Sequence, residues 1–91
     1  MSQTAQARCE ILNKRGLHAR AAAKFVKLAG QFGAEIRVTK GVNTVSGLSI
    51  MGLMMLAAAP GCCVDIAAKG DDAEAAVAAI AALIAAKFDE E

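Results

Sequence analysis

Residues 13–20, Asn-Lys-Arg-Gly-Leu-His-Ala-Arg, join a predicted strand to a predicted helix and carry the only histidine of the 91-residue chain. Gly16 suits the backbone angles of a tight turn, and the alanines that follow from Ala19 onward favour a helix. A helix that begins at about His18 leaves its first backbone N–H groups without partners, beside the imidazole and at the positive end of the dipole. The junction is therefore predicted to bind an anion.

Two arginines flank the histidine, Arg15 before it and Arg20 after it. Arg20 in the first helical turn can present a planar fork of donors to a phosphate or a carboxylate. Imidazole is also a nucleophile near neutral pH, so the site is interpreted as a histidine that accepts a phosphoryl group beside donors that hold it. The alternative is that His18 is a helix cap or a satisfied surface group, and the local pattern leaves both open.

Length and composition bound the class of protein. A chain of 91 residues predicts a single domain over residues 1–91 with one core. A net charge of +1, with three phenylalanines and neither tryptophan nor tyrosine, argues against binding to nucleic acid or to an anionic membrane surface. Any anion site must therefore be local.

The cysteines and the apolar runs indicate a cytoplasmic protein. Cys9, Cys62 and Cys63 are an odd number, and an adjacent pair on a strand is a poor disulfide or metal clamp, so neither a metal site nor a cofactor is expected. The first residues do not form a signal peptide, and the apolar run 75–86 is shorter than the roughly 20 residues of a membrane span. No membrane insertion is expected.

Alternation of apolar and polar residues predicts four strands, at Ala7–Leu12, Ala34–Lys40, Thr44–Ser46 and Cys62–Ala68. Helical spacing predicts helices at Ala19–Phe32 and Ile50–Leu56, and a last helix that starts from a cap at Asp71 or Asp72. The order is β-α-β-β-α-β-α, and each strand has one apolar face. It predicts an α/β (α+β) open-faced sandwich, a four-stranded antiparallel sheet with three helices on one face. The acidic tail 88–91 is expected to be a frayed, solubilising end.

The second predicted helix is apolar on nearly every side. If Leu53 and Leu56 face the sheet, the remaining large side chains form an exposed apolar surface of adaptable shape, made of Ile50, Met51, Met54 and Met55. The alternative is that the methionines fill the core. Ser49 is either a plain helix cap or a hydroxyl placed for phosphorylation beside this surface.

Two motifs about thirty residues apart, 13–20 and the Ser-Ile-Met-Gly-Leu-Met segment 49–54, resemble the histidine-containing phosphocarrier family HPr. The resemblance extends over nearly the whole chain and includes the order of elements. The end of the chain, Lys-Phe-Asp-Glu at 87–90, is similar to the nitrogen-related NPr branch. The Ser49 segment looks more like the sugar branch of bacteria that own an HPr kinase.

The resemblance implies a stoichiometric carrier, rather than an enzyme, in the phosphoenolpyruvate-dependent phosphotransferase system. Enzyme I would phosphorylate Nδ1 of His18, and a IIA protein or domain would then take the phosphoryl group. Arg20 would contact the phosphate together with the N–H groups of Ala19 and Arg20, and Ser49 would be the regulatory serine, modified by an HPr kinase/phosphorylase.

The resemblance also implies a docking surface, which Ile50, Met51 and Met54 would form with Met55 beside them, and a cytoplasmic monomer. One departure is Ala21, where the family commonly has proline. Because proline at the first turn fixes helix geometry, alanine is expected to loosen the site slightly. Two other classes remain as alternatives: an adaptor module that uses the methionine surface, and an RNA-binding α/β module, which the charge and the lack of aromatic residues weaken.

Overall fold

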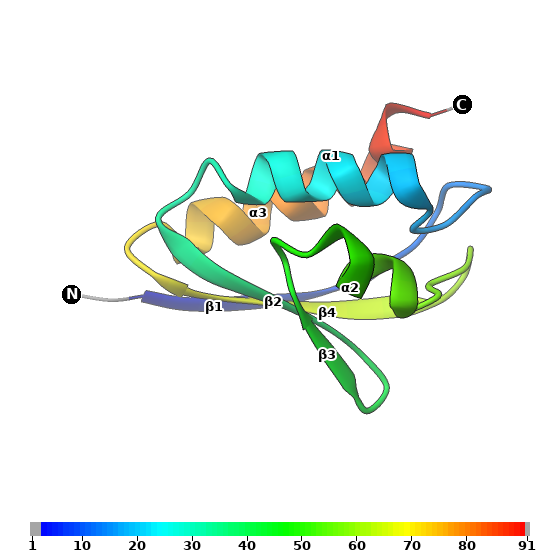
Figure 1. The fold of residues 1–91 in the computed structure, drawn as a ribbon. Helices are drawn as coiled ribbons and strands as arrows, with labels where there is room; N and C mark the ends of the chain where they lie inside the picture. Colours follow the sequence, from blue (N-terminus) through cyan, green and yellow to red (C-terminus); the bar gives the residue numbers. More distant parts are fainter. Residues whose placement is uncertain (1–2, 91) are drawn as a thin grey trace.

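The computed structural model describes residues 3–90, in which three α-helices cover one face of a four-stranded antiparallel sheet (Figure 1). The strands are β1 (Gln3–Glu10), β2 (Ala34–Lys40), β3 (Asn43–Ser46) and β4 (Cys63–Gly70). The helices are α1 (Ala19–Ala29), α2 (Ile50–Met55) and α3 (Ala73–Ala85), followed by a short turn, η1 (Lys87–Asp89). The predicted fold class and element order are confirmed.

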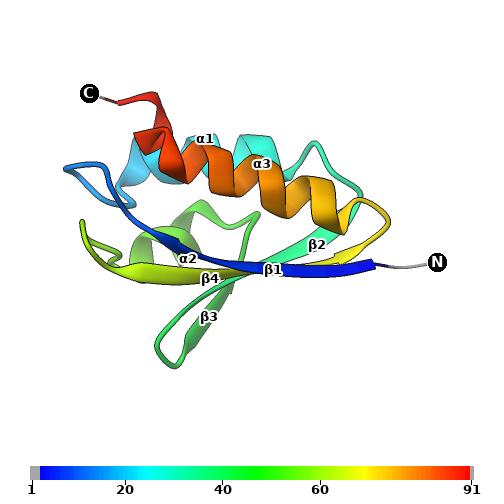
Figure 2. The same cartoon turned by 180° about the vertical axis from the view of Figure 1, so that it is seen from behind.

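The sheet has the strand order β1-β4-β2-β3, with β4 paired to both β1 and β2. Alternation along β2 and β4 buries Ile36, Val38, Val64 and Ile66 on the face that the helices cover. The opposite face carries polar side chains, including the Arg8–Asp65 ion pair at 3.0 Å between Nε and Oδ1. An apolar face on one side only explains why the helices form a single layer (Figure 2).

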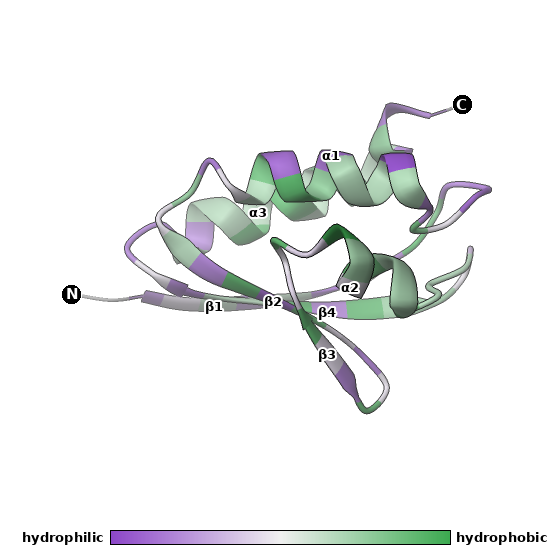
Figure 3. Ribbon diagram, in the orientation of Figure 1, coloured by the Kyte–Doolittle hydropathy of each residue, from purple (hydrophilic) through white to green (hydrophobic). Residues whose placement is uncertain are grey.

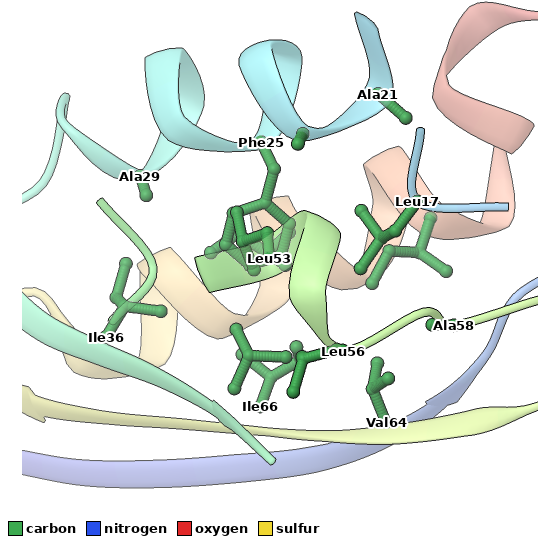
Figure 4. Close-up of a cluster of buried hydrophobic side chains, with 14 of the residues drawn as sticks. Leu17, Ala21, Phe25, Ala29, Ile36, Leu53, Leu56, Ala58, Val64 and Ile66 are labelled. Atoms are coloured by element: carbon green, nitrogen blue, oxygen red, sulfur yellow. The ribbon is translucent and has the colours of Figure 1, made fainter. Parts of the chain in front are cut away.

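The core lies between the sheet and the helix layer, where α3 packs on β1, β4 and β2, and α1 contacts α2 and α3. Its largest members are two phenylalanines, Phe25 and Phe88, and Phe25 of α1 points down toward Leu53 of α2 (Figure 4). Small side chains let the layers approach closely, since Ala21 and Ala22 are fully buried in α1 and Ala73 and Ala76 are fully buried in α3. No helix among residues 3–90 is long and apolar enough to cross a membrane.

The limits of three strands differ from the prediction, although β3 differs only in beginning one residue earlier, at Asn43. β1 pairs with β4 from Gln3 opposite Gly70 to Glu10 opposite Cys63, so it begins earlier than the predicted Ala7 and ends before Leu12. The backbone hydrogen bonds of a ladder do not depend on hydropathy, which is why the polar start of β1 gave no alternating signal. β4 accordingly begins at Cys63 rather than Cys62 and runs two residues past the predicted Ala68.

Two helix limits also differ, and the smaller difference is that α2 ends at Met55 rather than at the predicted Leu56. α1 ends at Ala29, with Gly30 at its C-cap, rather than at the predicted Phe32 and Gly33. The N–H of Gly33 instead donates to Oδ2 of Asp72 at 2.9 Å. Asp72 does occupy the N-cap position of α3, but its side chain makes no cap hydrogen bond there, because it holds the loop after α1.

The prediction of a frayed acidic tail is wrong. Phe88 is fully buried in the core, and its carbonyl accepts a hydrogen bond of 2.7 Å from Nζ of Lys24 in α1. Lys87, Phe88 and Asp89 all have positive φ, between 55° and 61°, so the chain turns back toward the helix layer. Figures 1 and 2 both show the tail at the end of the molecule where α1 begins. Glu91 lies outside the described residues.

Candidate functional site

The loop before α1 is held against the segment that follows α2. The N–H of Leu17 donates to the carbonyl of Ala58 at 3.0 Å, and Leu17 itself is buried. Gly16 adopts φ +63°, and a Cβ built on it would lie 2.3 Å from the same Ala58 oxygen. The predicted turn at Gly16 is therefore confirmed, and it also requires the absence of a side chain. Through this contact the first motif is fastened to the segment that follows the second motif.

His18 occupies the N-cap position of α1 with extended backbone angles, φ −75° and ψ 178°, but its side chain makes no cap hydrogen bond. The helical ladder begins with the bond from the Ala22 N–H to the His18 carbonyl at 2.8 Å. The N–H groups of Ala19, Arg20 and Ala21 consequently have no acceptor within the helix, and the positive end of the dipole lies beside the imidazole. His18 is therefore the N-cap residue in position, but its side chain does not cap the helix.

The imidazole is paired through one nitrogen only. Nε2 of His18 contacts Oε2 of Glu90, and among residues 3–90 no hydrogen-bond partner engages Nδ1. The other oxygen of Glu90, Oε1, accepts a hydrogen bond of 3.0 Å from Nδ2 of Asn13. These two hydrogen bonds, Asn13 first, lower the pKa of Glu90, assisted by the charge of Arg15. Glu90 is therefore an ionised carboxylate at neutral pH.

Asn13 is fully buried and also donates from Nδ2 to the carbonyl of Gly16 at 2.8 Å. Both partners of Nδ2 are oxygen atoms that only accept, which determines the orientation of the amide. Its own Oδ1 finds no partner among the described residues, and this unpaired buried acceptor is an energetic cost of the arrangement. Asn13 thus connects the loop, the glycine turn and the tail.

At Glu90, the partner of His18, the surface forms a shallow depression lined by four cationic side chains and two carboxylates, namely Lys14, Arg15, Arg20, Lys24, Asp89 and Glu90. Arg20 is exposed on the first turn of α1, where its guanidinium is free to meet an anion. The cationic excess favours binding of an anion with more than one negative charge. The structure therefore brings both predicted arginines to the region of His18.

Sequence reasoning missed Glu90 as a member of the site and assigned no role to Asn13. The one available signal was Phe88, a large apolar residue in an otherwise charged end of the chain. When Phe88 is buried in the core, the residues beside it are held against the rest of the domain. Which surface they meet depends on where α3 ends, and local sequence does not contain that information.

Ser49 and the second motif adopt the predicted arrangement. Oγ of Ser49 accepts a hydrogen bond of 2.9 Å from the Gly52 N–H, which makes it the cap of α2. Leu53 and Leu56 are buried, whereas Met51 and Met55 are 72% and 78% exposed. Ile50 and Met54 are about two-fifths exposed, at 42% and 41%. Figure 3 shows apolar colouring along α2. The exposed fractions of these four side chains show that they form an apolar surface rather than core filler.

Together these features define a class, a small open-faced α/β domain that presents one imidazole and a group of anion-binding donors at the start of its first helix. The family model described as the PTS HPr component phosphorylation site matches residues 5–86. The chain belongs to this HPr family.

Relatives and solved structures agree. The chain is 51% identical over 81 residues to the phosphocarrier protein HPr of Neisseria meningitidis serogroup A, covering 89% of this chain and 91% of the relative. It is 50% identical over 80 residues to the phosphocarrier protein NPr of Shewanella violacea, covering 88% of each. The crystal structure of HPr-C-His from Thermoanaerobacter tengcongensis superposes with a TM-score of 0.91 at 46% identity, covering 96% of this chain and 98% of that one.

Proposed function

We propose that this protein is a phosphoryl carrier of the phosphotransferase system, in which His18 accepts the group from phosphorylated enzyme I and passes it to a IIA protein or domain. The observation that carries the proposal is the geometry of the ring. Its Nε2 is occupied by Glu90, while Nδ1 has no partner among residues 3–90 and the ring lies beside free N–H groups at the start of α1. The names of relatives from both branches of the family support the same role.

The transfer step asks mainly for alignment and charge stabilisation. The lone pair of Nδ1 attacks phosphorus as the phosphorus–nitrogen bond of the donor phosphohistidine breaks, so one such bond replaces another. The N–H groups of Ala19 and Arg20 and the guanidinium of Arg20 would stabilise the phosphoryl oxygens. The same step in reverse, toward an acceptor histidine on the IIA protein, completes the cycle.

The apolar surface of α2, made of Ile50, Met51, Met54 and Met55, would dock both partners in turn. Methionine side chains adapt their shape at little cost, which suits a surface that meets different proteins in succession. The contact must also release quickly, so we expect modest interfaces formed by a monomer.

The direct test mixes the protein with phosphoenolpyruvate and enzyme I and measures acid-labile phosphate. We expect stoichiometric labelling of the wild type and none of His18→Ala, since no other histidine exists in the chain. Circular dichroism of the variant confirms that it is folded. Equal labelling of His18→Ala, or no labelling of the wild type, would exclude the carrier function. An adaptor, by contrast, would keep its partners without His18.

We further propose that phosphorylation of Ser49, by an HPr kinase/phosphorylase, opposes charging at His18. A phosphoserine places about −1.5 to −2 charges beside Ile50 and Met51, on a surface that docks through apolar contact. We expect one charge on this docking surface to weaken the contact with enzyme I by about 1–2 kcal/mol. Ser49→Asp is therefore expected to slow charging by enzyme I roughly tenfold. The control is Gln6→Glu, which adds one charge on the exposed face of β1. Equal rates for the two variants would remove the regulatory role.

A further inference from the structure

On the basis of the proposed transfer at His18, we propose that Glu90 is a positioning residue, which accepts a hydrogen bond from the Nε2–H of His18 and so keeps the nucleophilic lone pair on Nδ1. The starting observation is the contact between Oε2 of Glu90 and Nε2 of His18. Glu90 is 72 residues from His18 in the sequence and belongs to the tail that was predicted to be frayed.

The chemistry of the two groups assigns the proton. An ionised carboxylate only accepts hydrogen bonds, so the nitrogen that faces it must carry a hydrogen. A neutral imidazole has one protonated nitrogen and one lone pair, and the lone pair is then on Nδ1. Without such a partner the ring is free to exchange between both tautomers, one of which has no lone pair at the attacking position.

Several independent contacts hold the carboxylate in place, which distinguishes it from an ordinary surface ion pair. Oε1 is bonded to the fully buried Asn13 at 3.0 Å, and the adjoining turn is anchored by the buried Phe88 and by Lys24. Three consecutive residues of η1 with positive φ are costly for side chains other than glycine. Such a conformation persists where the surrounding contacts determine it, and here it delivers Glu90 to the ring.

The same contact assists the chemical step. When Nδ1 bonds to phosphorus, the imidazole ring gains positive charge, and a carboxylate on Nε2–H stabilises that charge, as the aspartate does in a Ser-His-Asp triad. When the phosphoryl group leaves, the bonding pair returns to Nδ1 and the proton stays on Nε2. No proton enters or leaves the pair. The cationic side chains of the depression, Arg15 and Arg20 among them, balance the negative charge that Glu90 brings close to the phosphoryl oxygens.

The decisive experiment compares Glu90→Gln with Glu90→Ala in the charging assay with enzyme I. Asn13 donates to the Oε1 position, so it draws the carbonyl of the glutamine toward itself and leaves the glutamine NH₂ facing the imidazole. That NH₂ requires a lone pair on Nε2 and moves the ring proton to Nδ1, where attack must start. We expect charging to fall roughly tenfold for Glu90→Gln, and only about two- to threefold for Glu90→Ala, which leaves the ring free.

This order is the reverse of what a merely structural role predicts, because glutamine preserves the shape of glutamate better than alanine does. Glu74→Gln, an equal change of charge at an exposed position in the first turn of α3, is the control and is expected to charge at the wild-type rate. A Glu90→Gln variant that charges as fast as wild type, or faster than Glu90→Ala, would overturn the inference.

A measurement without enzyme I separates this inference from the proposed function. His18 is the only histidine, so the ¹⁵N spectrum of the ring at alkaline pH reports its tautomer unambiguously. We expect hydrogen on Nε2 in the wild type and a shift toward Nδ1 in Glu90→Gln. An unlabelled wild type with this tautomer shift would exclude the carrier role and leave the Glu90 contact standing. If the wild type charges normally and Glu90→Gln has the same tautomer as the wild type, the role of Glu90 alone is excluded.

Discussion

Phe88→Ala is expected to lower the free energy of unfolding by about 3–5 kcal/mol, the range for truncating a buried aromatic side chain. That is a large part of the roughly 5–15 kcal/mol available to a typical small domain. Phe88 is fully buried, and it is one of only two phenylalanines in a core made mainly of small aliphatic side chains. Its neighbours Lys87 and Asp89 have no comparable anchor, so the loss also releases the positive-φ turn.

The consequence extends to the site. Once the turn is free, the Lys24 bond to the Phe88 carbonyl and the Glu90 contacts with Asn13 and His18 are no longer held in place. Urea unfolding followed by circular dichroism measures the loss of stability. Phe32→Ala is the matched control, because Phe32 is only half-buried in the turn after α1 and is expected to cost less. Equal stability of Phe88→Ala and wild type would show that the tail is not part of the core.

Gly16→Ala is expected to destabilise the protein by at least about 2 kcal/mol and to disturb the start of α1. Two costs combine at this position. Alanine disfavours φ +63°, and its Cβ would lie 2.3 Å from the Ala58 oxygen, a backbone atom that cannot rotate away. That oxygen also accepts the Leu17 N–H, so relief of the clash moves the residue directly before His18.

Gly41→Ala separates the two costs. Gly41 has nearly the same φ, +62°, but nothing lies within 4 Å of the Cβ it would gain. The control should therefore show only the conformational cost of about 1 kcal/mol, whereas Gly16→Ala should show the clash as well. Unfolding by urea gives the stabilities, and the charging rate with enzyme I reports the site. If both variants lose the same stability, the contact with Ala58 does not constrain the loop.

Much of the fold was predictable because its signals are local. The alternation in residues 34–40 and 62–68 identified the inner faces of β2 and β4. The helical spacing predicted an apolar stripe on α1 of Ala22, Val26 and Ala29, joined by Phe25 and Phe32. Of these, Ala22, Phe25 and Ala29 are buried, whereas Val26 and Phe32 are half-buried. For α2 the sequence left two arrangements open, and the structure has the one in which Leu53 and Leu56 face the core and the methionines lie outside. Each of these assignments rests on a period of two or of 3.6 residues, which the chain carries within a short window.

The element limits were less predictable, because partners elsewhere in the chain decide them. The start of β1 depends on pairing with β4, and the end of α1 at Ala29 accompanies the bond between the Gly33 N–H and Asp72. Asp72 illustrates the difficulty, because its side chain suits a helix cap but binds a loop 39 residues away instead. Local propensity indicates which cap positions and helix ends are favourable, and contacts with distant residues decide which of them the protein uses.

The residues of the two motifs and the order of elements were enough to define an open-faced α/β domain with an imidazole at a helix start. They also placed Ser49 as the cap of α2, because a serine cap bonds to an N–H three residues along the chain. The carboxylate partner of that imidazole was decided by tertiary structure alone. Glu90 meets His18 because Phe88 is buried in the core, beside α3, and its carbonyl bonds to Lys24 of α1, and no periodicity within the tail encodes those distant partners.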